Sequence, residues 1–174
     1  EAAAEFVDVF LPDLKYFSAE TAQQLAGAPD YFPVAMAAIR AMCQAKGAPV
    51  YDGEGLMRSG TLVRHLILPL RTSESLGILD AIARELPPGT PVSLMRQYTP
   101  MNGVDLPGLD RRLTGREYAR VRDFMLALGL EGYVQSRESA DSAFTPAFMD
   151  VESTRLFPPE RSDAEKANFS HLGG

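Results

Sequence analysis

Four short apolar runs, separated by segments with helical periodicity, constrain the fold of this chain more than any other feature. We expect strands over residues 7–11, 61–69, 91–95 and 132–136. The segments between them repeat apolar residues three or four positions apart, as amphipathic helices do. Such alternation favours right-handed crossovers and a largely parallel sheet. The sequence therefore predicts an α/β domain whose three or four parallel strands form half of a barrel or a small open sheet.

Local signals predict where the helices begin and where the chain turns. Residues that favour a helix start precede or open the periodic segments, and they are Ser18, Pro33, the run TSES at 72–75, and Thr114. Thr114 and Glu117 together form a capping box, which strengthens that helix start. The pair Asp52-Gly53 is typical of a tight hairpin turn, so we expect a small hairpin before the second long strand.

Composition excludes several classes of protein. The net charge is −6 and the isoelectric point is near 4.9, which argues against non-specific binding to nucleic acid or to acidic membranes. No apolar run approaches the length of a membrane span, and the start, EAAAEF, lacks the pattern of a signal peptide. Cys43 is the only cysteine, so a disulfide framework is excluded. We expect a cytoplasmic protein without nucleic-acid or membrane partners.

Charged and polar residues lie where three of the expected strands end. Asp13 and Lys15 follow the first strand, Arg64 lies inside the second, and Gln97 and Tyr98 follow the third. Ligands of parallel α/β folds bind at the carboxyl ends of the strands. A basic side chain suits a ligand carboxylate, and an acidic one suits an ammonium or hydroxyl group. These residues are therefore the candidates for a ligand site.

Arg64 and its neighbour His65 fall within one strand, so their side chains should point to opposite faces of the sheet. A buried arginine requires a partner charge. Asp13 on the neighbouring strand and a ligand carboxylate both satisfy this need, and the spacing does not choose between them. For His65, a hydrogen-bonded packing role is favoured over a ligand contact.

No general catalytic or metal-binding motif is present. Two histidines and one cysteine make no evident metal-ligand set. The G-x-S-x-G, Walker A and G-x-G-x-x-G motifs are absent, and Cys43 is most simply a core residue of a helix. Ser93 with His65 is the one nucleophile–base pair that can be constructed. It would fit an unrelated hydrolase or a phosphate-handling barrel, which is an alternative hypothesis for this chain.

Several stretches, in order, resemble the C-terminal half of radical S-adenosylmethionine proteins, and most of all those related to pyruvate formate-lyase activating enzyme. The similarity runs from about Val7 to about Phe148. The stretches are VDVFLPDLKYF, GAPDYF, GLMRSGTLVRHLILP, VSLMRQYTPM and LTGREYARVRDFMLALGLEGYVQ. The D-x-K after an apolar strand and the R-H-L-hydrophobic-L-P strand are fairly specific when both occur.

The resemblance implies a partial TIM-type (β/α)6 barrel, of which residues 1–137 supply the second half and residues 138–174 a C-terminal tail. It implies S-adenosylmethionine as the ligand at the carboxyl ends of the strands. The site residues that it implies are Asp13 and Lys15 from D-x-K, Arg64 from the second strand, and Gln97 and Tyr98 at the end of the next strand.

The chain also departs from the family pattern. The three cysteines spaced C-x3-C-x2-C that bind a [4Fe-4S] cluster are absent, as is the Gly-Gly-Glu segment, and Leu70 stands where a glycine often follows the second strand. The resemblance thus implies a fragment whose parent cleaves S-adenosylmethionine reductively and abstracts hydrogen, with a glycyl-radical enzyme as protein substrate. Without the cluster ligands, the chain alone should be inactive. For such a fragment we expect an uncovered sheet edge that favours a homodimer. The alternative is a non-catalytic binding or scaffolding module.

Overall fold

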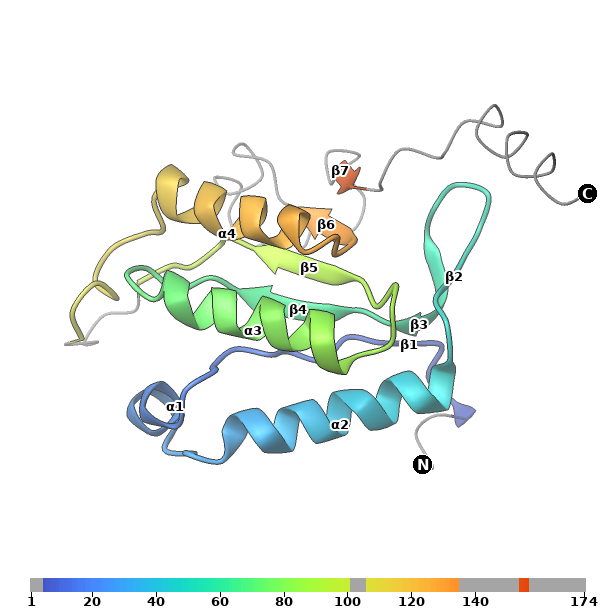
Figure 1. The fold of residues 1–174 in the computed structure, drawn as a ribbon, viewed down its shortest axis with the longest axis horizontal. Coiled ribbons are helices and arrows are strands. Elements are labelled where there is room, and N and C mark those ends of the chain that lie inside the picture. Colours follow the sequence, from blue (N-terminus) through green and yellow to red (C-terminus); the bar gives the residue numbers. More distant parts are fainter. Residues whose placement is uncertain (1–4, 101–105, 135–153, 157–174) are drawn as a thin grey trace, which may run out of the picture.

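The computed structural model describes residues 5–100, 106–134 and 154–156 of the 174-residue chain (Figure 1). The described residues form a mixed α/β fold with four helices, which confirms the expected fold class at this level. In chain order the elements are β1 (Val9–Phe10), α1 (Ala19–Ala26), α2 (Tyr31–Lys46), β2 (Val50–Tyr51), β3 (Met57–Thr61), β4 (Val63–Leu66), α3 (Thr72–Glu85), β5 (Val92–Met95), α4 (Gly115–Ala127), β6 (Gly132–Val134) and β7 (Thr154–Leu156).

The strands form two sheets, ordered β1-β3-β2 and β4-β5-β6-β7. The pairs β1–β3, β4–β5 and β5–β6 are parallel, whereas β2–β3 and β6–β7 are antiparallel. Backbone hydrogen bonds also join the segment after β1 to β4, because Arg64 N donates to Pro12 O at 2.8 Å and Leu14 N donates to Arg64 O at 2.9 Å. The parallel strand lines therefore lie side by side in sequence order, and no closed barrel forms within the described ranges.

The strands are shorter than the sequence predicted. The expected strand over residues 61–69 divides at Leu62, where β3 gives way to β4. The expected hairpin is confirmed, since β2 and β3 pair around Asp52, whose Oδ1 accepts hydrogen bonds from the backbone of Glu54 and Leu56. The expected tail contributes β7, which pairs with β6, and the boundary at residue 137 lies outside the described residues.

The helix starts agree with the local signals in two of four cases, α1 and α4. Ser18 caps α1 and Gly27 ends it with a φ of 65°, and Thr114 and Glu117 form the capping box of α4. The expectation that Pro33 opens a helix was wrong by two residues, because α2 begins at Tyr31. Pro33 is the third residue of α2, a position where a missing N–H is still tolerated. The expectation for TSES was wrong, because α3 already begins at Thr72 and no side chain caps it.

One apolar core joins the sheet to three helices. In β4 and β5 buried and half-buried residues alternate, so one face of each strand is covered. The core cluster consists of Leu14, Met36, Ile39, Cys43, Val63, Ile67, Ile78, Leu79, Ile82, Leu86, Val92, Leu94, Leu113, Tyr118, Val121 and Met125. Helices α3 and α4 lie together on one side of the sheet, and α2 runs beside β1 and β3 (Figure 1). The expected core position of Cys43 is confirmed.

Among the described residues, no helix combines the length and the apolar character that crossing a membrane requires.

Candidate functional site

Asp13 lies between two basic side chains, beside the second residue of β4. Its Oδ1 is 2.7 Å from Nη2 of Arg64, and its Oδ2 is 3.4 Å from Nζ of Lys15. The side chains of Asp13, Lys15 and Arg64 are 29%, 44% and 38% exposed, so solvent or a ligand reaches all three. We call these three residues the charged cluster. The structure thus brings together three of the five residues that the sequence singled out.

The register of the sheet explains why the cluster forms. Asp13 is the bridge partner of Arg64 in a parallel arrangement, and Ser93 on β5 is the next partner of Arg64. Residues that pair across parallel strands point to the same face, so all three share one face of the sheet. Leu14 and His65, which alternate with Asp13 and Arg64, are buried on the opposite face against the helices. We call the side that carries Arg64 and Ser93 the open face.

The charged cluster retains unused hydrogen-bonding capacity. Asp13 Oδ1 touches Arg64 at ion-pair distance, yet neither this oxygen nor Nε of Arg64 has a hydrogen-bond partner, and both atoms are buried. Buried polar atoms in proteins are almost always hydrogen-bonded. The exposed parts of these three charged side chains are what a small polar ligand with its own hydroxyl or charged groups would contact.

The backbone of the segment 13–15 is held by side chains from two other elements. The hydroxyl of Tyr31 donates to Asp13 O at 2.9 Å and accepts from Lys15 N at 3.0 Å. His65 Nδ1 lies 2.7 Å from Leu14 O, and its Nε2 lies 2.8 Å from the hydroxyl of Ser75 on α3. The expected packing role of His65 is therefore what the structure shows. Burial lowers the pKa of His65 from 6.5 to about 4, so the ring is neutral at pH 7.

The other two sequence candidates lie at the end of β5. Gln97 is exposed, and Tyr98 is half-buried. The Tyr98 hydroxyl donates to Leu109 O at 2.8 Å, which ties it to the loop that precedes α4. Burial, together with the nearby charge of Asp110, raises the pKa of Tyr98. In this structure Tyr98 thus orders the loop, while the charged cluster is made from the two preceding strand lines.

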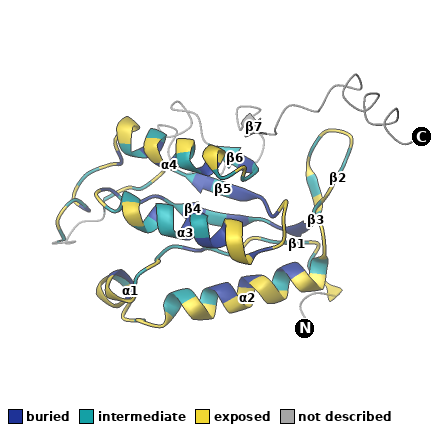
Figure 2. Ribbon diagram, in the orientation of Figure 1, coloured by how far each residue is buried: buried dark blue, intermediate teal, exposed yellow. Residues whose placement is uncertain are grey.

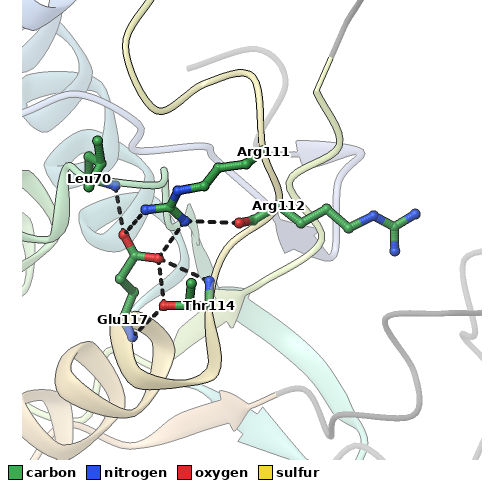
Figure 3. A network of polar contacts seen from close by, with 5 residues as sticks. All are labelled: Leu70, Arg111, Arg112, Thr114 and Glu117. Carbon is green, nitrogen blue, oxygen red and sulfur yellow. Dashed lines mark hydrogen bonds and ion pairs between the residues drawn. The ribbon is translucent and has the colours of Figure 1, made fainter.

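A second polar network, centred on Glu117, joins two loops to the start of α4 (Figure 3). The Glu117 carboxylate accepts two hydrogen bonds from the guanidinium of Arg111, at 2.8 and 2.9 Å, and one from Leu70 N at 2.8 Å. It also accepts from the backbone and the hydroxyl of Thr114. The bonds from Arg111, followed by those from the two backbone groups and the hydroxyl, hold the Glu117 pKa well below its usual value. The loops after β4 and β5 are thereby joined to the start of α4.

Leu70 is strained at this junction. Its φ is 58°, and it is the one non-glycine residue with a positive φ in the described part of the chain. A leucine in this left-handed conformation costs about 1 kcal/mol or more, whereas a glycine adopts it without strain. The bond from Leu70 N to Glu117 and the contact of its side chain with Gly108 offset that cost. A glycine would thus suit this position on physical grounds.

Sequence reasoning missed several residues that build the site. The capping box identified Glu117, but nothing in the spacing pointed to Arg111 as its partner. Tyr31 and Ser75 showed no signal of their own, since a tyrosine early in a helix and a serine in a helical stripe are ordinary. Their roles depend on contacts 16 to 18 residues away for Tyr31 and 10 residues away for Ser75.

The hydrolase reading is wrong. Ser93 pairs with Arg64, and its side chain is on the open face, whereas His65 points to the helices on the opposite face. Both ring nitrogens of His65 are already engaged by Leu14 and Ser75. A nucleophile–base pair between Ser93 and His65 is therefore excluded.

In the ranges that the structure describes, no group of three or more histidine, cysteine, aspartate or glutamate side chains could hold a metal ion. Comparison with known proteins adds no further constraint: no family model, no curated protein and no solved structure matches the chain.

Proposed function

We propose that this chain is the C-terminal half of a radical S-adenosylmethionine enzyme, similar to pyruvate formate-lyase activating enzyme, and that the charged cluster binds the cofactor. The observation that supports this most is the joining of D-x-K and R-H-L into one cluster with unused hydrogen-bonding atoms on the open face. The two motifs are about fifty residues apart in sequence and become direct neighbours in the sheet.

The groups of the cluster fit the ligand. S-adenosylmethionine has a carboxylate, an ammonium group, a sulfonium and ribose hydroxyls. The ammonium of Lys15 suits the carboxylate, the carboxylate of Asp13 suits an ammonium or a hydroxyl, and the guanidinium of Arg64 suits an oxygen. Ser93, next to Arg64 on the open face, adds a hydroxyl. These residues bind and orient the cofactor but have no redox role.

The [4Fe-4S] group of a radical S-adenosylmethionine enzyme would supply the electron that cleaves the cofactor. This chain has one cysteine, Cys43, which is 4% exposed and packed in the core, so its own residues do not hold a [4Fe-4S] group. The ligands belong, in this proposal, to the other half of the parent protein. Hydrogen abstraction from a glycyl-radical enzyme or another protein substrate is a property of the parent and not of this chain.

The unpaired side of β1 supports the proposal that another strand belongs at this edge of the sheet. In the described residues β1 pairs with β3 alone, and the backbone of Val9 and Leu11 on its other side faces away from the sheet. Leu11 is 40% exposed there. An unpaired parallel edge is a template for another strand. The strand would come from the other half-barrel, or from a second copy when the chain is isolated, which gives a homodimer in a cytoplasmic setting.

A non-catalytic binding or scaffolding module is the second candidate. It is favoured by the continuous core, which joins α2, α3 and α4 to the sheet without help from another chain. A parent gene that encodes no cysteine triad ahead of this segment would select this candidate, and iron and sulfide analysis of the full-length protein would give the same answer.

Ligand binding is tested by titrating S-adenosylmethionine into the isotope-labelled chain and following amide chemical shifts. We expect weak but saturable shifts confined to the segment 13–15, Arg64 and Ser93. Lys15→Ala and Arg64→Ala should each raise the dissociation constant about tenfold, the loss of roughly one charge-assisted contact. Arg84→Ala, which removes an exposed ion pair with Asp80 on α3, is the matched control. Unchanged binding in both site variants would refute the assignment.

A further inference from the structure

The Asp13–Leu14–Lys15 segment is fixed although it lies beyond the end of β1. Four of its backbone groups are hydrogen-bonded to residues distant in sequence. Asp13 O accepts from Tyr31, Leu14 N donates to Arg64 O, Leu14 O faces His65 Nδ1, and Lys15 N donates to Tyr31. A segment after a two-residue strand would otherwise be free to change its backbone angles, and with them the distance between the two charged side chains.

Tyr31 bridges both ends of the segment with one oxygen. Its hydroxyl donates to the carbonyl before Leu14 and accepts from the amide after it, at 2.9 and 3.0 Å. The ring packs edge-to-face against Tyr16 with a centroid distance of 5.1 Å, which fixes its direction. Because Tyr31 is the first residue of α2, the position of this helix is transmitted to the peptide groups beside Asp13 and Lys15.

His65 and Ser75 hold the middle of the segment from the helix-covered face. A carbonyl only accepts, so the Nδ1 that faces Leu14 O carries the proton, and Nε2 then accepts from the hydroxyl of Ser75. Both His65 and Ser75 are 1% exposed. Leu14 O and the Ser75 hydroxyl thus keep the proton of the neutral ring on Nδ1, in a place that water does not reach. Because Ser75 belongs to α3, this helix sets the direction of the bond from His65 to Leu14.

We propose that Tyr31, and His65 oriented by Ser75, are positioning residues that set the spacing between Asp13 and Lys15 for a zwitterionic ligand. The proposal explains why Arg and His follow one another in the second strand: Arg64 holds the Asp13 side chain on the open face, and His65 holds the peptide behind it. A site that grips two charges needs both anchors at a fixed separation. The ligand class rests on the proposed function, whereas the positioning role is a property of the chain alone.

The test without ligand is amide hydrogen exchange on the full chain. Tyr31→Phe removes the acceptor of Lys15 N and keeps the ring, so we expect exchange of the Lys15 amide to rise at least tenfold. The Val92 amide, which donates to Glu131 O in the centre of the sheet, should be unchanged. His65→Leu removes the donor to Leu14 O, which belongs to the same peptide group as Lys15 N, so it should also raise exchange at Lys15. His65→Asn should restore protection, because the side-chain amide nitrogen of asparagine occupies the place of Nδ1.

A second experiment measures how tightly the same variants bind S-adenosylmethionine. Tyr31→Phe and His65→Leu should weaken binding about tenfold, and His65→Asn should recover most of it. A rise in exchange shared by Lys15 and Val92 in Tyr31→Phe would mark global destabilisation and overturn the positioning role, as would unchanged exchange at Lys15. If exchange rises locally but the unaltered chain does not bind the cofactor, the positioning role stands and the proposed function fails.

Discussion

The two faces of the central sheet differ although they come from the same strands. Between residues 63 and 68, Val63, His65 and Ile67 are at most 1% exposed, whereas Arg64 and its alternating neighbours are half-buried. Buried positions, drawn dark blue, also appear in β5 and along α2 and α3 (Figure 2). The helix-covered face is therefore built for stability, and the open face retains charge and accessible surface. Changes on the first should affect folding, and changes on the second should affect binding.

The largest effect is expected for a large-to-small substitution on the helix-covered face. Leu94 on β5 is fully buried, and Leu66 on β4 is half-buried on the open face. Leu94→Ala removes packed methyl groups and leaves a cavity, so it should lower the free energy of unfolding by about 4 kcal/mol. The same substitution at Leu66 should lower it by about 1 kcal/mol, because solvent already reaches the site. Urea unfolding of both variants measures the difference, and equal losses would contradict the division between the faces.

Acid should destabilise the helix-covered face through His65. Its pKa is about 4 in the folded chain and near 6.5 when unfolded, so between these values the unfolded state binds the extra proton. This stability is fully present above pH 6.5 and is lost as the pH falls toward 4, by about 3 kcal/mol. The hydrogen bond to Leu14 O and then the nearby charge of Glu74 limit this lowering of the pKa.

The measurement compares the unfolding free energy of the unaltered chain and of His65→Asn across this range. The carboxylates of both proteins titrate alike, so the difference between the two curves isolates the histidine. Parallel curves would show that His65 does not titrate on unfolding as expected.

Much of the fold could be predicted because its signals are local. Apolar runs located four strand regions, the capping box located the start of α4, and Asp52-Gly53 located the hairpin. The failures arose where distant contacts decide the local structure. Ser75 was expected to help cap α3, but His65 accepts its hydroxyl inside the core, and the second strand divides at Leu62 where its partner changes from β2 to β5.

The candidate site divides in the same way. Asp13 and Lys15 could be named because they follow an apolar run, and Arg64 because a charge inside a strand requires a partner. Tyr31 and Arg111 could not, because their partners are set by how α2 and the loop before α4 fold back on the sheet. Charge in an apolar setting is visible in a sequence, whereas a well-satisfied hydroxyl or guanidinium is not.

The smallest stability effect, and the sharpest separation of the two faces, is expected for Arg64→Met. The Arg64 side chain is 38% exposed, and ion pairs of this kind contribute little because water screens them. Methionine keeps apolar contact with the open face, and Lys15 remains to balance Asp13. The free energy of unfolding should therefore change by less than about 1 kcal/mol, while cofactor binding falls as in Arg64→Ala. Leu94→Ala should show the reverse, with lower stability and unaltered affinity of the folded fraction. If Arg64→Met were as destabilising as Leu94→Ala, the Asp13–Arg64 pair would be a structural tie between strands, and the open face would not be reserved for a ligand.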